Sequence, residues 1–202
     1  MEFTREQVEA AVKAKGYKWF ENGNYNLNIV GIRNSDTFDE VTNKFDDLLT
    51  VSYKVGNDLQ YHQWNCTTDP GKYYTENLLN PDGVAILVPN QYRGAYSIGM
   101  HQGKYEALKQ MKPLQVYRDD NKDNCYDMQP DNIQEGIYGI NIHRASSTGT
   151  STQIDKWSAG CQVIANYEDF NKLMWVAKQA EDVWGNSFTY TLLDSQDIQD
   201  II

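Results

Sequence analysis

Hydrophobic residues recur along this chain with two different spacings, one typical of helices and one typical of strands. Near its start and near its end, apolar residues recur at helical spacing, within residues 3–16 and 166–185. Elsewhere, short runs either alternate apolar with polar residues or are continuously apolar, as is typical of β-strands. These runs lie at 25–33, 48–55, 59–67, 84–88, 113–119, 136–143, 161–165 and 187–193. The pattern predicts a mainly β protein with some α+β character.

Local signals mark the ends of the two main helices. Thr4 and Gln7 have the spacing of a capping box, and Asn166 is placed to cap the second helix, which Gly185 ends. A further short helix is predicted over Lys104–Gln110. Together the elements predict a mixed barrel or sandwich of strands, with an N-terminal and a C-terminal helix packed on its outside.

No internal repeat and no linker of domain-boundary character interrupts the chain, so residues 1–202 are expected to form a single domain. Residues 1–80 contain the first helix and several strands, to which no role is assigned. Residues 166–202 contain the second helix and a final strand. The residues between them hold the chemistry considered below.

Charge and composition argue against several classes of function. The chain has 28 acidic and 18 basic residues, a formal net charge of −10 and a pI near 4.7, which argue against binding to nucleic acid or anionic lipid. No apolar run reaches the ~20 residues of a membrane span, and the start lacks the apolar stretch of a secretory signal. Three widely spaced cysteines form neither a disulfide framework nor a zinc pattern, so at least one thiol is expected to be free.

The candidate chemistry lies in one stretch. A predicted strand ends at His143, a hydroxyl-rich loop follows, and Ser158-Ala159-Gly160-Cys161 leads into the next strand. A catalytic cysteine needs a base that takes its proton, and His143 is placed to supply one. Gly160 permits a tight backbone that directs N–H groups toward an oxyanion, and Ser158 is a candidate for holding the imidazole. The plainer alternatives are a buried structural thiol and a turn serine.

At these residues the chain resembles the catalytic domain of the L,D-transpeptidases (YkuD type). The stretch "NIHRASSTGTSTQIDKWSAGCQVI" is similar to that family's signature, in which a strand-end histidine and a loop precede Ser-x-Gly-Cys. The clearest similarity covers residues 136–165. A looser one reaches back to residue 82 through "ILVPNQYRGAYSIGMH", as in members associated with bacteriophage genomes. Residues 82–165 are therefore the expected catalytic core.

The resemblance implies acyl transfer on peptidoglycan stem peptides through a thioester on Cys161. It assigns His143 as the base and Ser158 as the residue that orients it, and places the oxyanion at the backbone of Gly160 and Cys161. No cofactor or metal is implied. The implied setting is the bacterial cell wall, reached by phage release, as for an endolysin, or by export. Hydrolysis or transpeptidation, and the oligomeric state, stay open.

Two departures from the family pattern concern substrate binding. Ala159 stands where the family often has histidine, and Val163 where it commonly has arginine. His101, Arg93 and Arg144 are the candidates for replacing these groups, with Tyr92 as a wall of the groove. These four are the predicted substrate-binding residues. A catalytic Cys161 is expected to have a depressed pKa. The alternatives are a binding module for wall peptide or protein that has lost turnover, and a cysteine hydrolase of another amide or ester.

Overall fold

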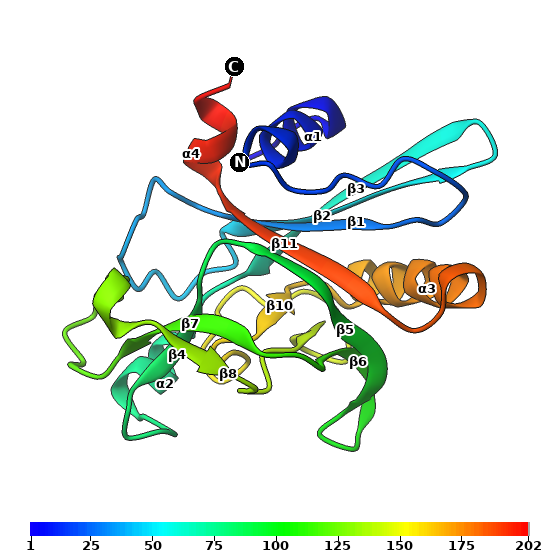
Figure 1. Ribbon diagram of the computed structural model, residues 1–202. Helices are drawn as coiled ribbons and strands as arrows, with labels where there is room; N and C mark the ends of the chain where they lie inside the picture. Colours follow the sequence, from blue (N-terminus) through cyan, green and yellow to red (C-terminus); the bar gives the residue numbers. More distant parts are fainter. Residues whose placement is uncertain (202) are drawn as a thin grey trace.

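A closed barrel of eight strands forms the centre of the computed structural model, which describes residues 1–201 (Figure 1). Neighbouring strands around the barrel follow the order β1-β11-β5-β6-β9-β10-β3-β2. Their bounds are β1 Asn28–Arg33, β2 Asp47–Val55, β3 Asp58–Thr67, β5 Gln91–His101, β6 Tyr105–Gln110, β9 Ile142–Arg144, β10 Gln162–Ile164 and β11 Phe188–Asp194. The β1–β11 and β9–β10 pairs are parallel and the other pairs are antiparallel. The prediction of a mainly β protein is confirmed, and of the two predicted architectures, a barrel or a sandwich of mixed strands, the structure has the barrel.

A three-stranded antiparallel sheet lies beside the barrel. Its order is β4-β7-β8, with β4 at Val84–Leu87, β7 at Leu114–Asp119 and β8 at Gln134–Gly136. It touches the loop before β10 closely, because a Cβ on Gly160 would lie 2.3 Å from the carbonyl oxygen of Ala85. The small sheet therefore supports the segment that carries the candidate cysteine.

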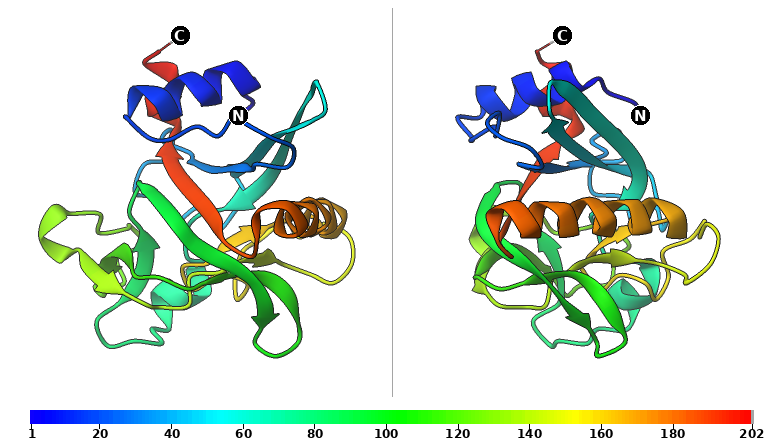
Figure 2. Two further views of the ribbon diagram at one scale, coloured as in Figure 1. Left: turned by 45° about the vertical axis from the view of Figure 1, so that its right-hand side comes forward. Right: turned by 90° about the vertical axis from the view of Figure 1, so that its right-hand side faces the viewer.

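Two helical regions pack on the outside of the barrel (Figures 1 and 2). Helix α3 (Tyr167–Trp184) lies along one side and contributes Leu173, Val176 and Ala177 to the main core. Helix α1 (Arg5–Ala14) and the short α4 (Ser195–Gln199) cover one end, above a second cluster of buried side chains. The remaining short helices are α2 at Lys72–Glu76 and the 3₁₀ turn at Pro130–Asn132.

The caps predicted for the two long helices are confirmed. The Thr4 side chain accepts from the backbone of Gln7, whose side chain accepts in return. The Asn166 carboxamide accepts from the first turn of α3, and Gly185 ends that helix with a φ of 84°. The hairpin predicted around Gly56-Asn57-Asp58 is also present, as the β2–β3 turn.

The helix predicted over Lys104–Gln110 is wrong, because these residues contain strand β6. Gln102 and Gly103 both have positive φ values, 51° and 69°, and turn the chain back so that β6 pairs with β5 along its whole length. The single strand predicted for 136–143 is also wrong: β8 ends at Gly136 and β9 begins only at Ile142. In both cases pairing with other strands decides the conformation.

The first eighty residues, which sequence alone left without a role, supply strands β1, β2 and β3 of the barrel. Strand β3 pairs directly with β10, with Val163 opposite Thr67. The candidate catalytic segment is therefore built into the same barrel as the N-terminal strands.

Candidate functional site

Strands β9 and β10 bring Cys161 and His143 to one face of the barrel. They are parallel neighbours with Val163 opposite His143, and the Gln162 N–H donates to the Asn141 carbonyl (2.9 Å). Extending this register by one residue places Cys161 beside Asn141, two positions before His143 and on the same side of the sheet. The two residues that the motif predicts as a pair are therefore adjacent in the fold.

The thiol of Cys161 faces backbone groups of the segment before β9. Its Sγ donates to the Gly139 carbonyl oxygen at 3.4 Å, and the side chain is half-buried. Burial raises the pKa of the thiol to about 11, an effect that a hydrogen bond from the Asn141 backbone partly offsets. The expectation of a depressed pKa is therefore wrong for the resting protein, in which Cys161 is a neutral thiol.

His143 is also neutral, and its tautomer is defined by the groups around it. Its Nδ1 lies 2.8 Å from the carbonyl oxygen of Arg144, which can only accept, so Nδ1 carries the proton. The Tyr105 hydroxyl approaches the same pair at 3.3 Å. Burial, followed by the neighbouring His101, lowers the pKa of His143 to about 3. Nε2 therefore retains its lone pair and can act as a base.

His101 is part of the same cluster. Its ring stacks on that of His143 with centroids 4.2 Å apart. The Asn141 carboxamide fixes it from the other side, with Nδ2 3.2 Å from His101 Nδ1. The prediction that His101 lies beside the site agrees with this position, whereas a role in binding substrate stays a prediction.

Ser158 holds the cysteine loop in place and does not contact a histidine nitrogen. Its hydroxyl donates to the Cys161 carbonyl (2.8 Å) and accepts from the Gly160 N–H (3.1 Å), while its own carbonyl accepts from Gly71 (2.8 Å). Arg144 provides the carbonyl that orients His143 instead. Because the Gly160 N–H already has a partner, it is not directed at an oxyanion in this state.

A cavity of about 410 Å³ opens beside His143 and contains no acidic side chain in its lining. Three cations line it: Lys104, Arg144 and Lys156. The Arg144 guanidinium lies 4.1 Å from the ring centre of Tyr105. Within residues 1–201, none of these three cations forms an ion pair. In a chain of net charge −10, this arrangement favours an anionic ligand.

A smaller cavity of about 160 Å³ lies next to the cysteine loop. Ala159 and Ile140 line it, and Tyr74 lines both this cavity and the one beside His143. Both cavities are therefore lined by residues of the segment that leads to the thiol. Cys161 itself lines neither of them.

The structure does not bring Arg93 and Tyr92 to this site. Arg93 lines a different cavity and stands eight positions from His101 along β5, roughly 26 Å at about 3.3 Å per residue. Tyr92 is buried, and its hydroxyl donates to the Val88 carbonyl (2.6 Å). Val163, at the family's arginine position, is fully buried in a small apolar cluster against which Cys161 packs.

Sequence reasoning missed several residues of the site. Asn141, Lys104 and Lys156 carry no motif or spacing that marks them as site residues. Three residues of the segment between His143 and Cys161, namely Ser147, Lys156 and Trp157, line the cavity. A useful signal would have been the absence of acidic residues from 140 to 154, in an otherwise acidic chain.

Within residues 1–201, no group of three His, Cys, Asp or Glu side chains is arranged to hold a metal ion. Over the same residues, no helix combines the length and the apolar character that crossing a bilayer requires. Comparison with known proteins finds no match to a protein-family model, to a curated protein or to a solved structure. The resemblance to the L,D-transpeptidases therefore depends on the motif residues alone.

Proposed function

We propose that this protein catalyses cysteine-dependent acyl transfer on peptidoglycan stem peptides, with Cys161 as nucleophile and His143 as base. The observation that carries the proposal is the parallel pairing of β9 and β10, which joins the two motif residues on one face. The proposed setting is the bacterial cell wall, reached by phage release or export.

The reaction starts from a neutral pair. As Sγ attacks the substrate carbonyl, Nε2 of His143 takes the thiol proton, while the Arg144 carbonyl stabilises the imidazolium through Nδ1–H. Collapse of the tetrahedral adduct breaks the C–N bond, and the imidazolium returns its proton to the leaving amine. Water or a second amine then attacks the thioester carbonyl while His143 takes the proton of this nucleophile. The C–S bond breaks, and the imidazolium returns the proton to the Cys161 sulfur, which restores the neutral pair.

The proposed substrate is a peptide that carries carboxylates. Lys104, Arg144 and Lys156 line the cavity beside the base without acidic partners, and they supply the positive charge that Val163 does not. The second cavity, past Ala159, offers room for the other side of the scissile bond. The thiol must leave the Gly139 carbonyl to reach a substrate between these cavities.

A second candidate is a binding module for acidic wall peptide that has no turnover. The observation that favours it is the thiol itself, which has a raised pKa and lines neither cavity. The acid-free cavity would then be the binding site, and Cys161 a packing residue against the neighbouring apolar cluster.

The deciding experiment incubates the protein with defined muropeptides and follows products and protein mass by mass spectrometry. We expect a product that Cys161→Ala abolishes and that His143→Gln reduces by roughly 10²–10⁴-fold. Cys125→Ala, which changes an exposed thiol elsewhere, is the matched control and should retain activity.

Product formation that persists in Cys161→Ala would contradict the proposal. Absence of both product and adduct, with binding of the muropeptides retained, would favour the binding module. If the protein turns over other amides or esters but not muropeptides, the result would favour a cysteine hydrolase that acts on a different class of substrate.

A further inference from the structure

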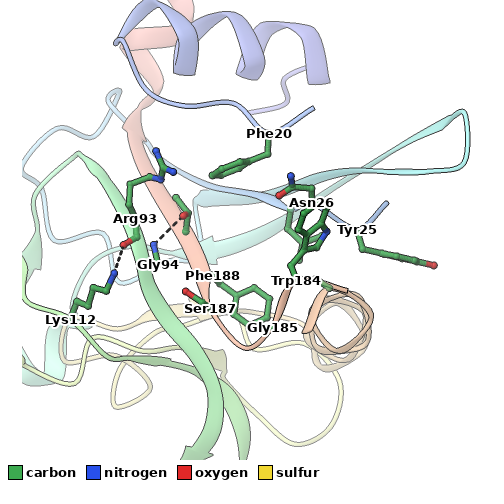
Figure 3. Close-up of a pocket in the computed structure, with 13 residues that line it drawn as sticks. Phe20, Tyr25, Asn26, Arg93, Gly94, Lys112, Trp184, Gly185, Ser187 and Phe188 are labelled. Carbon is green, nitrogen blue, oxygen red and sulfur yellow. Dashed lines mark hydrogen bonds between the residues drawn. The ribbon is translucent and has the colours of Figure 1, made fainter. Parts of the chain in front are cut away.

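A further cavity without acidic side chains in its lining lies at the end of β5 opposite His101, well away from the cysteine loop. It has a volume of about 340 Å³, at the lower end of the range for small-molecule sites. Its walls come from the segment before β1, from β5, from the end of α3 and from the start of β11 (Figure 3). The proposed acyl transfer gives this cavity no role.

Two cations lie on one side of the cavity. Arg93 reaches toward the ring of Phe20, with its guanidinium carbon 5.4 Å from the ring centre, and the Lys112 ammonium donates to the Arg93 carbonyl (3.1 Å) (Figure 3). No acidic residue lines the cavity, and neither cation forms an ion pair within residues 1–201. Two positive charges in one lining without a counter-charge favour an anionic group.

Aromatic rings form another part of the lining, and one of them is held rigidly. The Trp184 indole N–H donates to the Asn24 carbonyl (2.8 Å), and the ring packs so closely on Gly23 that a Cβ there would lie 2.6 Å from it. Phe20 lies on the Arg93 side of the cavity, and the half-exposed Trp184 lies across from it (Figure 3). Such fixed rings offer apolar faces to a ring-shaped ligand.

Uncharged polar side chains complete the lining. Asn26, Ser187 and Thr189 present an amide and two hydroxyls, and the Thr189 hydroxyl is already oriented because its oxygen accepts from the Gly94 N–H (3.1 Å). The Asn26 Nδ2 also has a partner, the Asn22 carbonyl (3.0 Å). An aromatic acid would use the cations and the rings but would leave the Ser187 hydroxyl and the remaining hydrogen-bonding capacity of Asn26 and Thr189 unused. A sugar ring would satisfy them with its own hydroxyls.

From this combination we infer that the cavity is a binding site for an acidic sugar, a pyranose that carries a carboxylate. The carboxylate pairs with Arg93 and Lys112, the ring packs against Trp184 and Phe20, and the hydroxyls bond to Asn26, Ser187 and Thr189. The inference does not depend on the proposed acyl transfer, since it involves no residue of that site.

An NMR titration of the isotope-labelled protein with glucuronate tests it, with glucose as the matched probe that has a hydroxymethyl group in place of the carboxylate. We expect glucuronate to shift the amides of Gly94, Gly185 and Ser187, with a dissociation constant of about 1 mM for a ligand of this size. Glucose should bind at least roughly tenfold more weakly, and added salt should weaken glucuronate only.

Variants then locate the site. Arg93→Gln and Lys112→Gln, both at exposed positions, should each weaken glucuronate roughly five- to tenfold. Lys109→Gln, on the neighbouring strand β6 outside the cavity, should leave it unchanged. Equal binding of glucose, tighter binding of benzoate than of glucuronate, absence of shifts at these amides, or unchanged binding in Arg93→Gln would each overturn the inference. None of these results bears on Cys161-dependent turnover.

Discussion

The two sides of the barrel differ in how much strand pairing they contain. The β2–β3 hairpin has nine paired positions, from Asp47 opposite Cys66 to Val55 opposite Asp58, and β1 adds five more along β2. On the other side, β9 and β10 share three paired positions, and β6 meets β9 at the single pair of Leu108 and Ile142. The candidate nucleophile Cys161 and base His143 both lie on the sparsely paired side.

The densely paired side is therefore expected to stabilise the fold, whereas the sparsely paired side carries the candidate nucleophile and base. The long hairpin satisfies its backbone groups in regular ladders, and its buried face belongs to the main core. The loops beside the short strands are held by side-chain hydrogen bonds, such as that from the Ser158 hydroxyl to the Cys161 carbonyl. Segments held in this way can rearrange at lower free energy than the core, and the thiol has to move before it can react.

The largest expected effect comes from the hairpin. Leu49 on β2 is fully buried, so Leu49→Ala should lower the free energy of unfolding by about 2–5 kcal/mol through lost burial and the cavity left behind. Leu59→Ala, in the same hairpin but 53% exposed, should change it by less than about 0.5 kcal/mol. Urea unfolding measures both. A loss below about 1 kcal/mol for Leu49→Ala, one-fifth of the upper expectation, would refute the assignment of stability to this hairpin.

A smaller effect is expected in the cysteine loop. Gly160 has a φ of 123° and lies against the Ala85 carbonyl, so Gly160→Ala should cost roughly 1–3 kcal/mol and displace the thiol. Turnover should then fall by more than the loss of folded protein explains. Gly149→Ala, in the same loop at a φ of 61° with no atom within 4 Å of the added carbon, is the control for backbone strain alone. Equal activity in the two variants would argue against a supporting role for the small sheet.

The last comparison concerns the pH dependence of stability on the two sides. His143 has a folded pKa of about 3 against an ordinary 6.5, so the unfolded chain binds its proton first and stability is lost as the pH falls below 6.5. Burial, followed by the nearby Asp69, raises the pKa of Asp47 above 3.8, so stability is gained as the pH falls through that raised pKa toward 3.8.

Substitutions separate the two contributions. In urea unfolding between pH 7 and pH 4.5, His143→Gln should become more stable relative to the unsubstituted protein as the pH falls, because the loss due to His143 is removed. Asp47→Asn should become relatively less stable over the same range, because the gain due to Asp47 is removed. Parallel pH profiles for all three proteins would show that neither group titrates as its burial implies.

Much of the local structure could be predicted from the sequence. The capping box at Thr4 and the cap at Asn166 depend on residues within one turn, and both are present. The β2–β3 hairpin also follows from neighbouring residues. Lys104–Gln110 was wrongly predicted as helix because its conformation depends on pairing with β5, which local pattern does not encode.

The candidate site could likewise be predicted from the sequence only in part. The motif residues Cys161 and His143 follow from sequence spacing, and the β9–β10 register places them on the same side of the sheet, two positions apart. The partners of each were not found. Ser158 bonds within its own loop, Arg144 supplies the carbonyl for His143, and Arg93 lines a separate cavity.

The sequence by itself therefore determined the mainly β composition, the ends of the long helices and the pair of residues that carries the proposed chemistry. These depend on hydrophobic period, on caps and on a short motif, all of which are local in the chain. Only the tertiary structure decided that eight strands close into a barrel, that both Cys161 and His143 are neutral, and that cations gather without acids in two separate cavities. The physical reason is that burial and charge surroundings come from residues distant in sequence, whose positions are set when the strands pair.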